Sequence, residues 1–427
     1  MLTTTTYALA RQRRRFERIR YQLGGGILVG AVLPYLFLIA QGESWASGGM
    51  IASAIASVAA ILIGAYAIRS FANHPGAKSS IVALPCMLAG FALAAVALLM
   101  LRLDYVRPQL LGGAVLAVIW YVGVLTSAER TKRLRVGVVP FGDAFDLTGI
   151  RSVEWRILPD TKSPADDVDV IVADLRYDLD DEWERWLAQR TLEGQLVCHS
   201  KQLRESLTGM VKIDHLSENT FGSLMPIAAY VTVKQAIDII TAAIALPFLL
   251  LLLAILYPLV RMESEWPLIF RQQRIGYRGR PFTVFKVRTM RKAAPTGQTC
   301  ERQASMTADN DPRITRLGRF LRRTRIDELP QIFNVLRCEM SWIGPRPEAT
   351  SLSRWYEDEL PFYSYRHVVR PGITGWAQVN QGHVTAVHEV DEKLQNDFYY
   401  IKYFSPWLDA LIVIRTIQIL LSGFGAR

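Results

Sequence analysis

Two adjacent carboxylates, Asp327 and Glu328, stand among arginines in the stretch from Asp311 to Glu348. Pro330 follows three residues after Asp327, and proline is tolerated only in the first turn of a helix, so the pair is expected at a helix N-terminus. Free N–H groups and the helix dipole favour an anion there. The nearby arginines are Arg313, Arg316, Arg319, Arg322, Arg323, Arg325, Arg337 and Arg346. This arrangement suits a substrate with several phosphates; alternatively, Asp327 caps the helix and the arginines form a solvated face.

Longer segments around the acidic pair carry a family pattern. They are GRPFTVFKVRTM (Gly279–Met290), DELPQ, GPRP and RPGITGWAQVN (Arg370–Asn380). In this order they resemble the catalytic core of the bacterial sugar transferases, the monotopic polyprenol-phosphate phosphoglycosyl transferases, over roughly residues 234–424. The chain departs from the family pattern at Val287, where a phenylalanine is usual.

The resemblance implies a role for each of several side chains. Asp327 would attack the sugar-bearing phosphorus of a UDP-sugar, and Glu328 would assist by polarising or orienting groups around it. The substrate phosphates would be held by Lys286, Arg288, Arg322, Arg346 and Arg370. Arginine suits such contacts because its guanidinium can donate two parallel hydrogen bonds to a phosphate.

The resemblance also implies a divalent cation, because a carboxylate that approaches a diphosphate meets like charge. Mg²⁺ with oxygen ligands fits this need, and the family pattern places Asp327 and Asp397 on the metal. Asp397 could instead be a surface residue of a helix. The lipid substrate is expected to be undecaprenyl phosphate, with UMP as the other product.

The composition fits a membrane protein with more than one domain. The chain has 427 residues, half of them hydrophobic, and a net charge of +10. The basic excess lies in residues 261–346 beside an apolar segment, without a nucleic-acid-binding motif, which favours phosphorylated ligands and membrane lipids over nucleic acid. The four cysteines are scattered, as expected in a reducing cytosol.

Four apolar blocks predict a transmembrane module at residues 23–128, after a basic cytoplasmic N-terminus at residues 1–22. They are about Leu23–Ala40, Met50–Ile68, Ile81–Leu101 and Leu110–Thr126. Each is near the ~20 residues that cross a bilayer. The arginine-rich stretch 11–20 favours an inside N-terminus, and the loop Gln41–Gly49 has no Lys or Arg and is expected outside. Charged residues are absent from the interiors of the blocks, which argues against an ion-coupled transporter.

Residues 133–222 are expected to form a small Rossmann-like α/β domain. The predicted strands are Val136–Phe141, Val168–Leu175 and a run beginning at Gln195, with helices at Asp181–Gly194 and from Lys201. Strand–helix alternation implies a parallel sheet. The turn after the first strand is PFGDAFD rather than a glycine-rich fingerprint, so a structural or oligomerising role is favoured over dinucleotide binding.

A fifth apolar run, about Ile237–Val260, decides the topology. It is long enough to cross, which would place the arginine-rich domain outside. The resemblance instead implies a re-entrant helix at residues 230–262, and Pro247 supplies a candidate break, although the usual Ser-Pro pair is replaced near Leu250-Leu251. A mainly α-helical catalytic domain at residues 263–427 would follow, with Trp407–Phe424 interfacial rather than a sixth span.

The expected protein is therefore a transferase of hexose 1-phosphate at the cytoplasmic face of the bacterial inner membrane. The reaction would be ping-pong through a phospho-sugar aspartate and would initiate exopolysaccharide, O-antigen or capsule synthesis. The added membrane module suggests a homodimer. The alternative is a catalytically silent membrane scaffold of a polysaccharide assembly complex.

Overall fold

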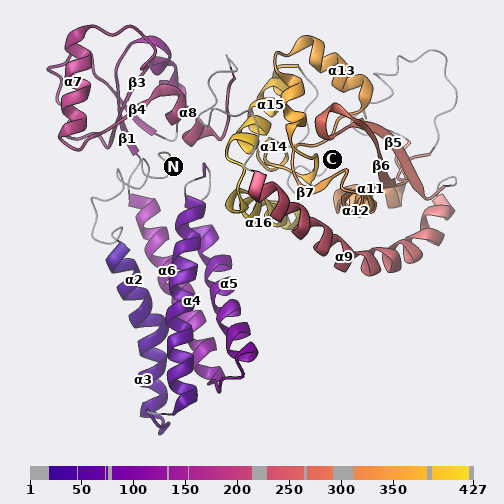
Figure 1. The fold of residues 1–427 in the computed structure, drawn as a ribbon, viewed down its shortest axis with the longest axis horizontal. Coiled ribbons are helices and arrows are strands. Elements are labelled where there is room, and N and C mark those ends of the chain that lie inside the picture. The colour runs from indigo at the N-terminus through magenta and orange to yellow at the C-terminus, as the bar shows by residue number, and fades with distance from the viewer. Residues whose placement is uncertain are drawn as a thin grey trace. The chain divides into compact units, whose positions relative to one another are not determined.

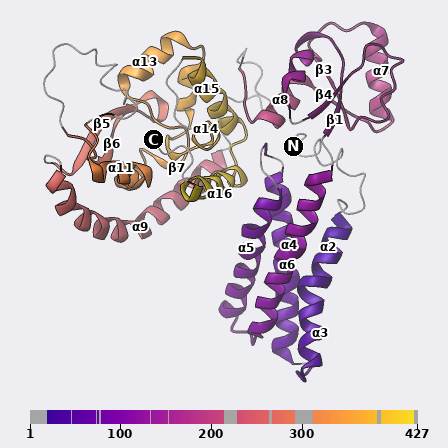
Figure 2. The same cartoon turned by 180° about the vertical axis from the view of Figure 1, so that it is seen from behind.

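The fold consists of two compact units, residues Met1–Gly209 and Met210–Arg427, each described here by itself. Figures 1 and 2 show the chain from opposite sides. The computed structural model describes residues 19–45, 47–72, 74–75, 79–131, 134–151, 153–213, 228–263, 267–291, 311, 313–381 and 387–422. Most of the basic stretch at 11–20 lies outside these described residues, which begin at Ile19.

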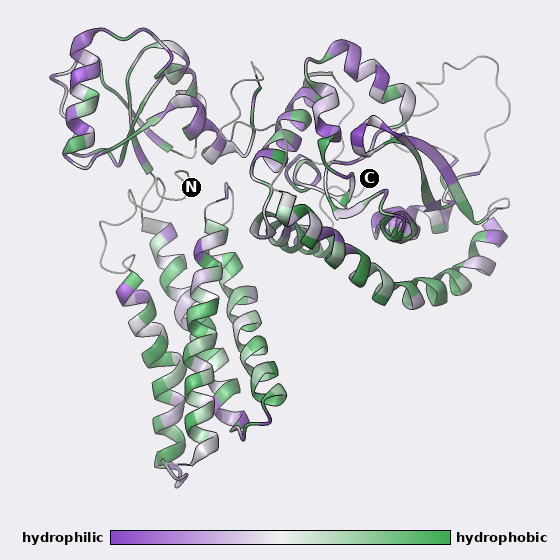
Figure 3. Ribbon diagram, in the orientation of Figure 1, coloured by the Kyte–Doolittle hydropathy of each residue, from purple (hydrophilic) through white to green (hydrophobic). Residues whose placement is uncertain are grey.

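The first unit begins with the apolar helices that the sequence predicts. They are α2 (Ile19–Ile27), η2 (Leu28–Val32), α3 (Leu33–Ala40), α4 (Gly48–Ala72), α5 (Ser79–Met100) and α6 (Arg107–Thr131). In Figure 3 the ribbons of these helices are coloured mostly as hydrophobic. Segments Ile19–Ala40, Gly48–Ala72, Ser79–Met100 and Arg107–Glu129 are long and apolar enough to cross a membrane. Pro34 lies in the first turn of α3, directly after the π-helical turn η2, so the apolar segment continues through it.

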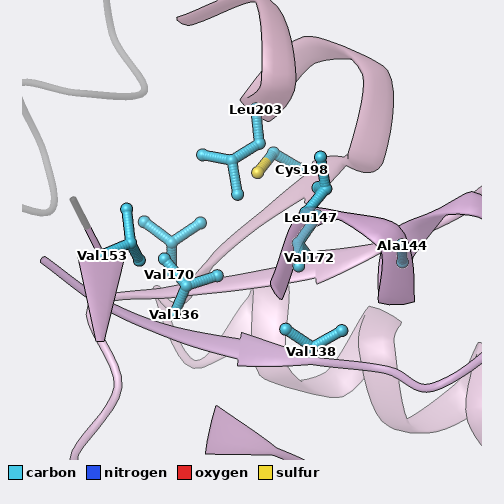
Figure 4. Close-up of a cluster of buried hydrophobic side chains, with 9 residues drawn as sticks. All are labelled: Val136, Val138, Ala144, Leu147, Val153, Val170, Val172, Cys198 and Leu203. Carbon is cyan, nitrogen blue, oxygen red and sulfur yellow. The ribbon is translucent and has the colours of Figure 1, made fainter. Parts of the chain in front are cut away.

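The same unit contains the α/β domain with a parallel sheet. Its elements are β1 (Leu134–Val138), η3 (Gly142–Gly149), β2 (Val153–Ile157), β3 (Val170–Ala173), α7 (Asp181–Leu192), β4 (Leu196–His199) and α8 (Ser200–Thr208). The sheet order is β2-β1-β3-β4 and each neighbouring pair is parallel, which confirms the predicted architecture. Valines of β1 and β3 pack with Leu147 and Leu203 in the core drawn in Figure 4.

Two features of this domain were not apparent in the sequence. Strand β2 pairs with β1 at the edge of the sheet although its sequence, VEWRI, lacks a continuous apolar run. After β1, Gly142 has a positive φ of 56°, which glycine adopts without strain, and an added Cβ there would also collide with Asp174. The Asp174 carboxylate accepts hydrogen bonds from the N–H groups of Asp143 and Arg176.

The second unit is mainly helical, with short sheets. Its first elements are α9 (Ala228–Glu263), β5 (Ile269–Ile275), η5 (Tyr277–Gly279), β6 (Pro281–Val287), α11 (Arg316–Arg323), η6 (Ile326–Gln331) and α12 (Ile332–Leu336). These are followed by β7 (Ser341–Ile343), α13 (Thr350–Glu359), η7 (Tyr363–Val368), β8 (Gly372–Thr374), α14 (Trp376–Asn380), α15 (Val387–Lys402) and α16 (Pro406–Ser422). Strands β5 and β6 form an antiparallel hairpin, and β7 and β8 pair in parallel.

Helix α9 differs from the expected helix–break–helix. It runs without interruption through Pro247 and Pro258, and Figure 1 shows it as a curved helix. Proline removes one backbone hydrogen bond, and here the result is bending rather than termination. One side of the helix, including Ala242 and Leu249, packs against β6 and α12, and Leu256 packs further along against β6 and α11. The core of the second unit is therefore built directly on α9.

Candidate active site

The acidic pair lies in the first turn of a helical segment, as the sequence predicts. Asp327 and Glu328 belong to the 3₁₀ helix η6, which continues into α12. Arg325, directly before η6, has a φ of 59°, so the chain turns sharply into the segment. Both carboxylates are buried, with exposed fractions of 8 % for Asp327 and 4 % for Glu328. The residue that caps η6 is Arg325, so Asp327 is not the helix cap of the alternative interpretation.

Glu328 is surrounded by cationic side chains. Lys286 Nζ, from β6, donates to Glu328 Oε1 at 3.0 Å, and the two terminal nitrogens of Arg346 contact both Glu328 oxygens. Arg325 Nη1 lies 3.5 Å from Oε2. Burial favours the neutral acid, but Arg346 and Lys286 outweigh burial and hold the pKa of Glu328 well below its usual value. Glu328 is therefore an ionised, anchored carboxylate.

Asp327 has a different environment from its neighbour. Among the described residues, its Oδ1 is buried and has no hydrogen-bond partner. Burial, followed by repulsion from ionised Glu328, raises the pKa of Asp327 to about 6, and Lys286, Arg322 and Arg346 oppose this rise. An acceptor oxygen without a donor keeps unused capacity to accept a hydrogen bond or to bind a cation.

The loop that carries Arg346 packs closely against the RPGITGW segment, and glycines in both segments allow their backbones to approach each other. Gly344 N–H donates to Thr374 O at 2.9 Å, and Gly372 N–H donates to Pro345 O at 3.0 Å. A Cβ added at Gly372 would lie 2.1 Å from Gly344 N, and one at Gly375 would lie 2.2 Å from Gly344 O. The GPRP and RPGITGW motifs therefore form one packed unit, which holds Arg346 against η6.

The other predicted phosphate-binding arginines have separate contacts. Arg322 Nε donates to Thr289 Oγ1 at 3.0 Å, and its charge acts on Asp327. Arg288 Nε donates to Pro267 O, and its guanidinium lies over Phe270. Arg370 Nε donates to Cys338 O, and its guanidinium lies over the Tyr277 ring. The structure thus brings Lys286, Arg322 and Arg346 to the acidic pair, whereas the contacts of Arg288 and Arg370 are with other groups.

The predicted metal ligands do not have equivalent surroundings. Asp397 Oδ2 lies 2.7 Å from Arg366 Nη2 in a buried ion pair. Within the described residues, no three His, Cys, Asp or Glu side chains are grouped as a protein-only metal cage. Asp327 Oδ1 fits Mg²⁺, which commonly takes one or two carboxylates and completes its octahedron with substrate phosphates and water.

Several residues next to the site were missed by sequence reasoning. Arg274, Arg366 and Lys393 reach the loop from Arg346 to Glu348 from three different elements. Arg366 stands in the YRHVVRPG run just before the RPGITGW motif, and this adjacency was the available signal. Arg274 and Lys393 lie in ordinary polar sequence, so only the tertiary structure identifies them.

Known proteins resemble this chain at both the family and the full-length level. Residues 229–423 match the model of the bacterial sugar transferase family. A UDP-N-acetylgalactosamine-undecaprenyl-phosphate N-acetylgalactosaminephosphotransferase of Aeromonas hydrophila is 38% identical over 423 residues, 98% of this chain and 99% of the relative. A UDP-glucose:undecaprenyl-phosphate glucose-1-phosphate transferase of Xanthomonas campestris pv. campestris is 44% identical over 44% of this chain and 38% of the relative. A transferase of the same name from Caulobacter vibrioides is 41% identical over 48% of this chain and 76% of the relative. The chain is therefore a member of the bacterial sugar transferase family.

Proposed function

We propose that this protein transfers a sugar 1-phosphate from a UDP-sugar to undecaprenyl phosphate, with release of UMP. The product would be the first lipid-linked intermediate of a surface polysaccharide. The full-length relative is named for UDP-N-acetylgalactosamine and the partial relatives for UDP-glucose, so both sugars are candidates. The observation that carries the proposal is the buried acidic pair, in which Glu328 is anchored and Asp327 Oδ1 has no hydrogen-bond donor among the residues that the structure describes.

The first half-reaction assigned to Asp327 is attack on phosphorus. A carboxylate oxygen of Asp327 forms a bond to the sugar-bearing phosphorus of the UDP-sugar, and the bridging P–O bond breaks, so UMP leaves with the bonding electrons. In the second half-reaction, a phosphate oxygen of undecaprenyl phosphate attacks the same phosphorus and releases Asp327. One phosphoanhydride replaces another, and no ATP is needed.

The surrounding side chains support this chemistry electrostatically. Lys286 and Arg346 keep Glu328 ionised and fixed, and Arg322 adds positive charge near Asp327. Bound Mg²⁺ would act as a Lewis acid and neutralise part of the negative charge of the substrate phosphates. Asp327 is the side chain that we propose as its ligand. Because the pair is buried, little water reaches Asp327 to screen these charges.

The packing of α9 supports a site at a membrane surface. The segment from Ala242 to Val260, roughly 27 Å of helix, packs on one side against the catalytic-domain core. The opposite side is apolar and exposed: Ile240, Ile244, Phe248, Leu251, Ile255, Leu259 and Met262. By length and composition α9 is able to cross a membrane. A crossing helix would carry the polar domain into the hydrocarbon, so we propose that α9 dips in and returns with both ends cytoplasmic.

UMP release by the purified full-length protein tests the function. The protein is supplied with Mg²⁺, undecaprenyl phosphate and, in turn, UDP-N-acetylgalactosamine, UDP-glucose, UDP-galactose and UDP-N-acetylglucosamine. We expect lipid-dependent UMP release with at least one of them. With the sugar nucleotide alone, intact-protein mass spectrometry should detect a sugar phosphate on the wild-type chain.

Asp327→Asn is the decisive variant for the mechanism. It should abolish both turnover and the covalent adduct, because an amide oxygen does not form the acyl phosphate. Asp166→Asn is the matched control, since it removes an exposed carboxylate beside Arg190 in the α/β domain and should leave both intact. A folded wild-type protein without UMP release from any UDP-sugar would instead favour the scaffold role.

A further inference from the structure

The Arg346 residue is held at both its side chain and its backbone. Its guanidinium contacts Glu328, and its carbonyl oxygen accepts a hydrogen bond of 2.8 Å from Arg366 Nη2. The next two residues of the loop are held as well, since Arg274 donates to Pro347 O and Lys393 pairs with the Glu348 carboxylate. The direction of the Arg346 side chain therefore depends on a loop that cationic side chains fix in place.

Arg366 is itself oriented by two partners. Its Nη1 donates to Tyr363 OH at 2.7 Å, and Asp397 Oδ2 lies 2.7 Å from Nη2. The exposed fractions of the Arg366 and Asp397 side chains are 3 % and 2 %. A chain of contacts thus runs from Asp397 through Arg366 and the Arg346 backbone to Glu328.

The buried ion pair between Arg366 and Asp397 is not well explained by a contribution to stability alone. Two charges are removed from water, and Arg366 Nε is buried without a hydrogen-bond partner among the described residues. Such pairs often add little or nothing relative to apolar side chains of similar size, whereas breaking one leaves a charge buried and unpaired. The geometry that the pair imposes on the Arg346 carbonyl is therefore the better explanation of its presence.

We propose that Arg366 and Asp397 are positioning residues for the reaction, which act by aligning Arg346 against Glu328. This proposal rests on the proposed transferase function and deepens it. It also gives Asp397 a role that differs from metal ligation, because its Oδ2 lies 2.7 Å from the positively charged Arg366 guanidinium. Mg²⁺ would then depend on Asp327 and the substrate phosphates rather than on Asp397.

A variant that replaces the whole pair with apolar side chains separates positioning from stability. We expect Arg366→Met combined with Asp397→Leu to unfold at a temperature close to that of the wild-type protein. The kcat for UMP release should nevertheless fall about 100-fold, because the Arg346 carbonyl loses its donor and the guanidinium is misplaced. Each single substitution should lower the unfolding temperature more than the double substitution does. Wild-type kcat in the folded double variant would overturn the proposal.

A more conservative variant and the metal requirement complete the test. Tyr363→Phe removes only the hydroxyl that orients Arg366 and should lower kcat with little change in KM or in the unfolding temperature. In Asp397→Asn, the Mg²⁺ concentration for half-maximal activity should stay unchanged, whereas loss of a metal ligand would raise it about 10-fold or more. Such a rise would refute the positioning role of Asp397. The unfolding measurements need no substrate, so they remain informative if the proposed transferase function fails.

Discussion

Arg346 contacts both oxygens of the Glu328 carboxylate through its two terminal guanidinium nitrogens. Because of this contact, the two neighbouring acids, Asp327 and Glu328, differ in charge state and in hydrogen bonding. Glu328 stays ionised among cations, while Asp327 keeps a buried oxygen without a donor among the described residues.

The pH dependence of kcat/KM should be bell-shaped. The charged groups that act on Asp327 include Glu328, Lys286, Arg322 and Arg346. The raised pKa of Asp327, about 6, means that the nucleophile is protonated and inactive below that pH. Burial lowers the pKa of Lys286 to about 8, so its charge is lost above that pH. Initial rates of UMP release across this range measure both limbs, and full activity at pH 4 would contradict the assignment.

Asp327→Asn should stabilise the folded protein at alkaline pH. The pKa of Asp327 in the folded protein, about 6, exceeds the ordinary 3.8, so protonation of this side chain stabilises the fold. This stabilisation is complete below pH 3.8 and is lost as the pH rises through 6. The ionised side chain then destabilises the fold by about 3 kcal/mol at pH 8, and asparagine removes this effect. Thermal unfolding of both proteins should show an advantage of the variant at pH 8 that shrinks at pH 5. An equal difference at both values would contradict the prediction.

Lys286 and Arg288 provide a matched comparison of two predicted phosphate-binding residues. Lys286→Met leaves Glu328 short of one cation and should reduce kcat/KM for UMP release about 100-fold. It should also move the acid limb of the pH profile upward, because Lys286 lowers the pKa of Asp327. Arg288→Met removes contacts with Pro267 and Phe270 and should have the smaller effect. The reverse order of effects would show that Arg288 turns to the substrate on binding.

Gly372→Ala should damage the fit between the two loop motifs. The added methyl group would meet Gly344 N at 2.1 Å, so the backbone of one motif must shift. We expect a loss of about 1–3 kcal/mol in the free energy of unfolding. The kcat should fall as well because Arg346 moves with its loop. Gly149→Ala is the control, since nothing lies within 4 Å of its added methyl group, and equal effects at the two positions would exclude a steric cause.

Both ends of α9 should be accessible from the cytoplasmic side. In a cysteine-free background, Thr232→Cys precedes the packed part of the helix and Arg271→Cys follows it, and both positions are exposed. Inverted vesicles should allow an impermeant maleimide to label both. Ser44→Cys, in the loop between α3 and α4, is the control for the opposite side and should react only from outside. Labelling of Thr232→Cys and Arg271→Cys from opposite sides would establish that α9 crosses.

The amino-acid sequence predicts those elements whose signal lies in neighbouring residues. Apolar runs of membrane length predict α4, α5 and α6, and short buried runs predict β1 and β3, because periodicity and length are properties of neighbouring residues. Pro330 places the acidic pair in the first turn of a helical segment for the same reason. Strand β2 was missed because its place in the sheet depends on pairing with β1, nineteen residues before it in register.

The distribution of charge around the acidic pair depends on the three-dimensional fold. Asp327 and Glu328 are adjacent in sequence, yet the cations that separate their pKa values come from β6 and from the loop after β7. Asp397 pairs with Arg366 rather than standing alone, and α9, which bends where it contains Pro247 and Pro258, packs one side on the core and exposes the other. Electrostatic interaction and packing depend on distance in space, and folding sets that distance between residues far apart in the chain.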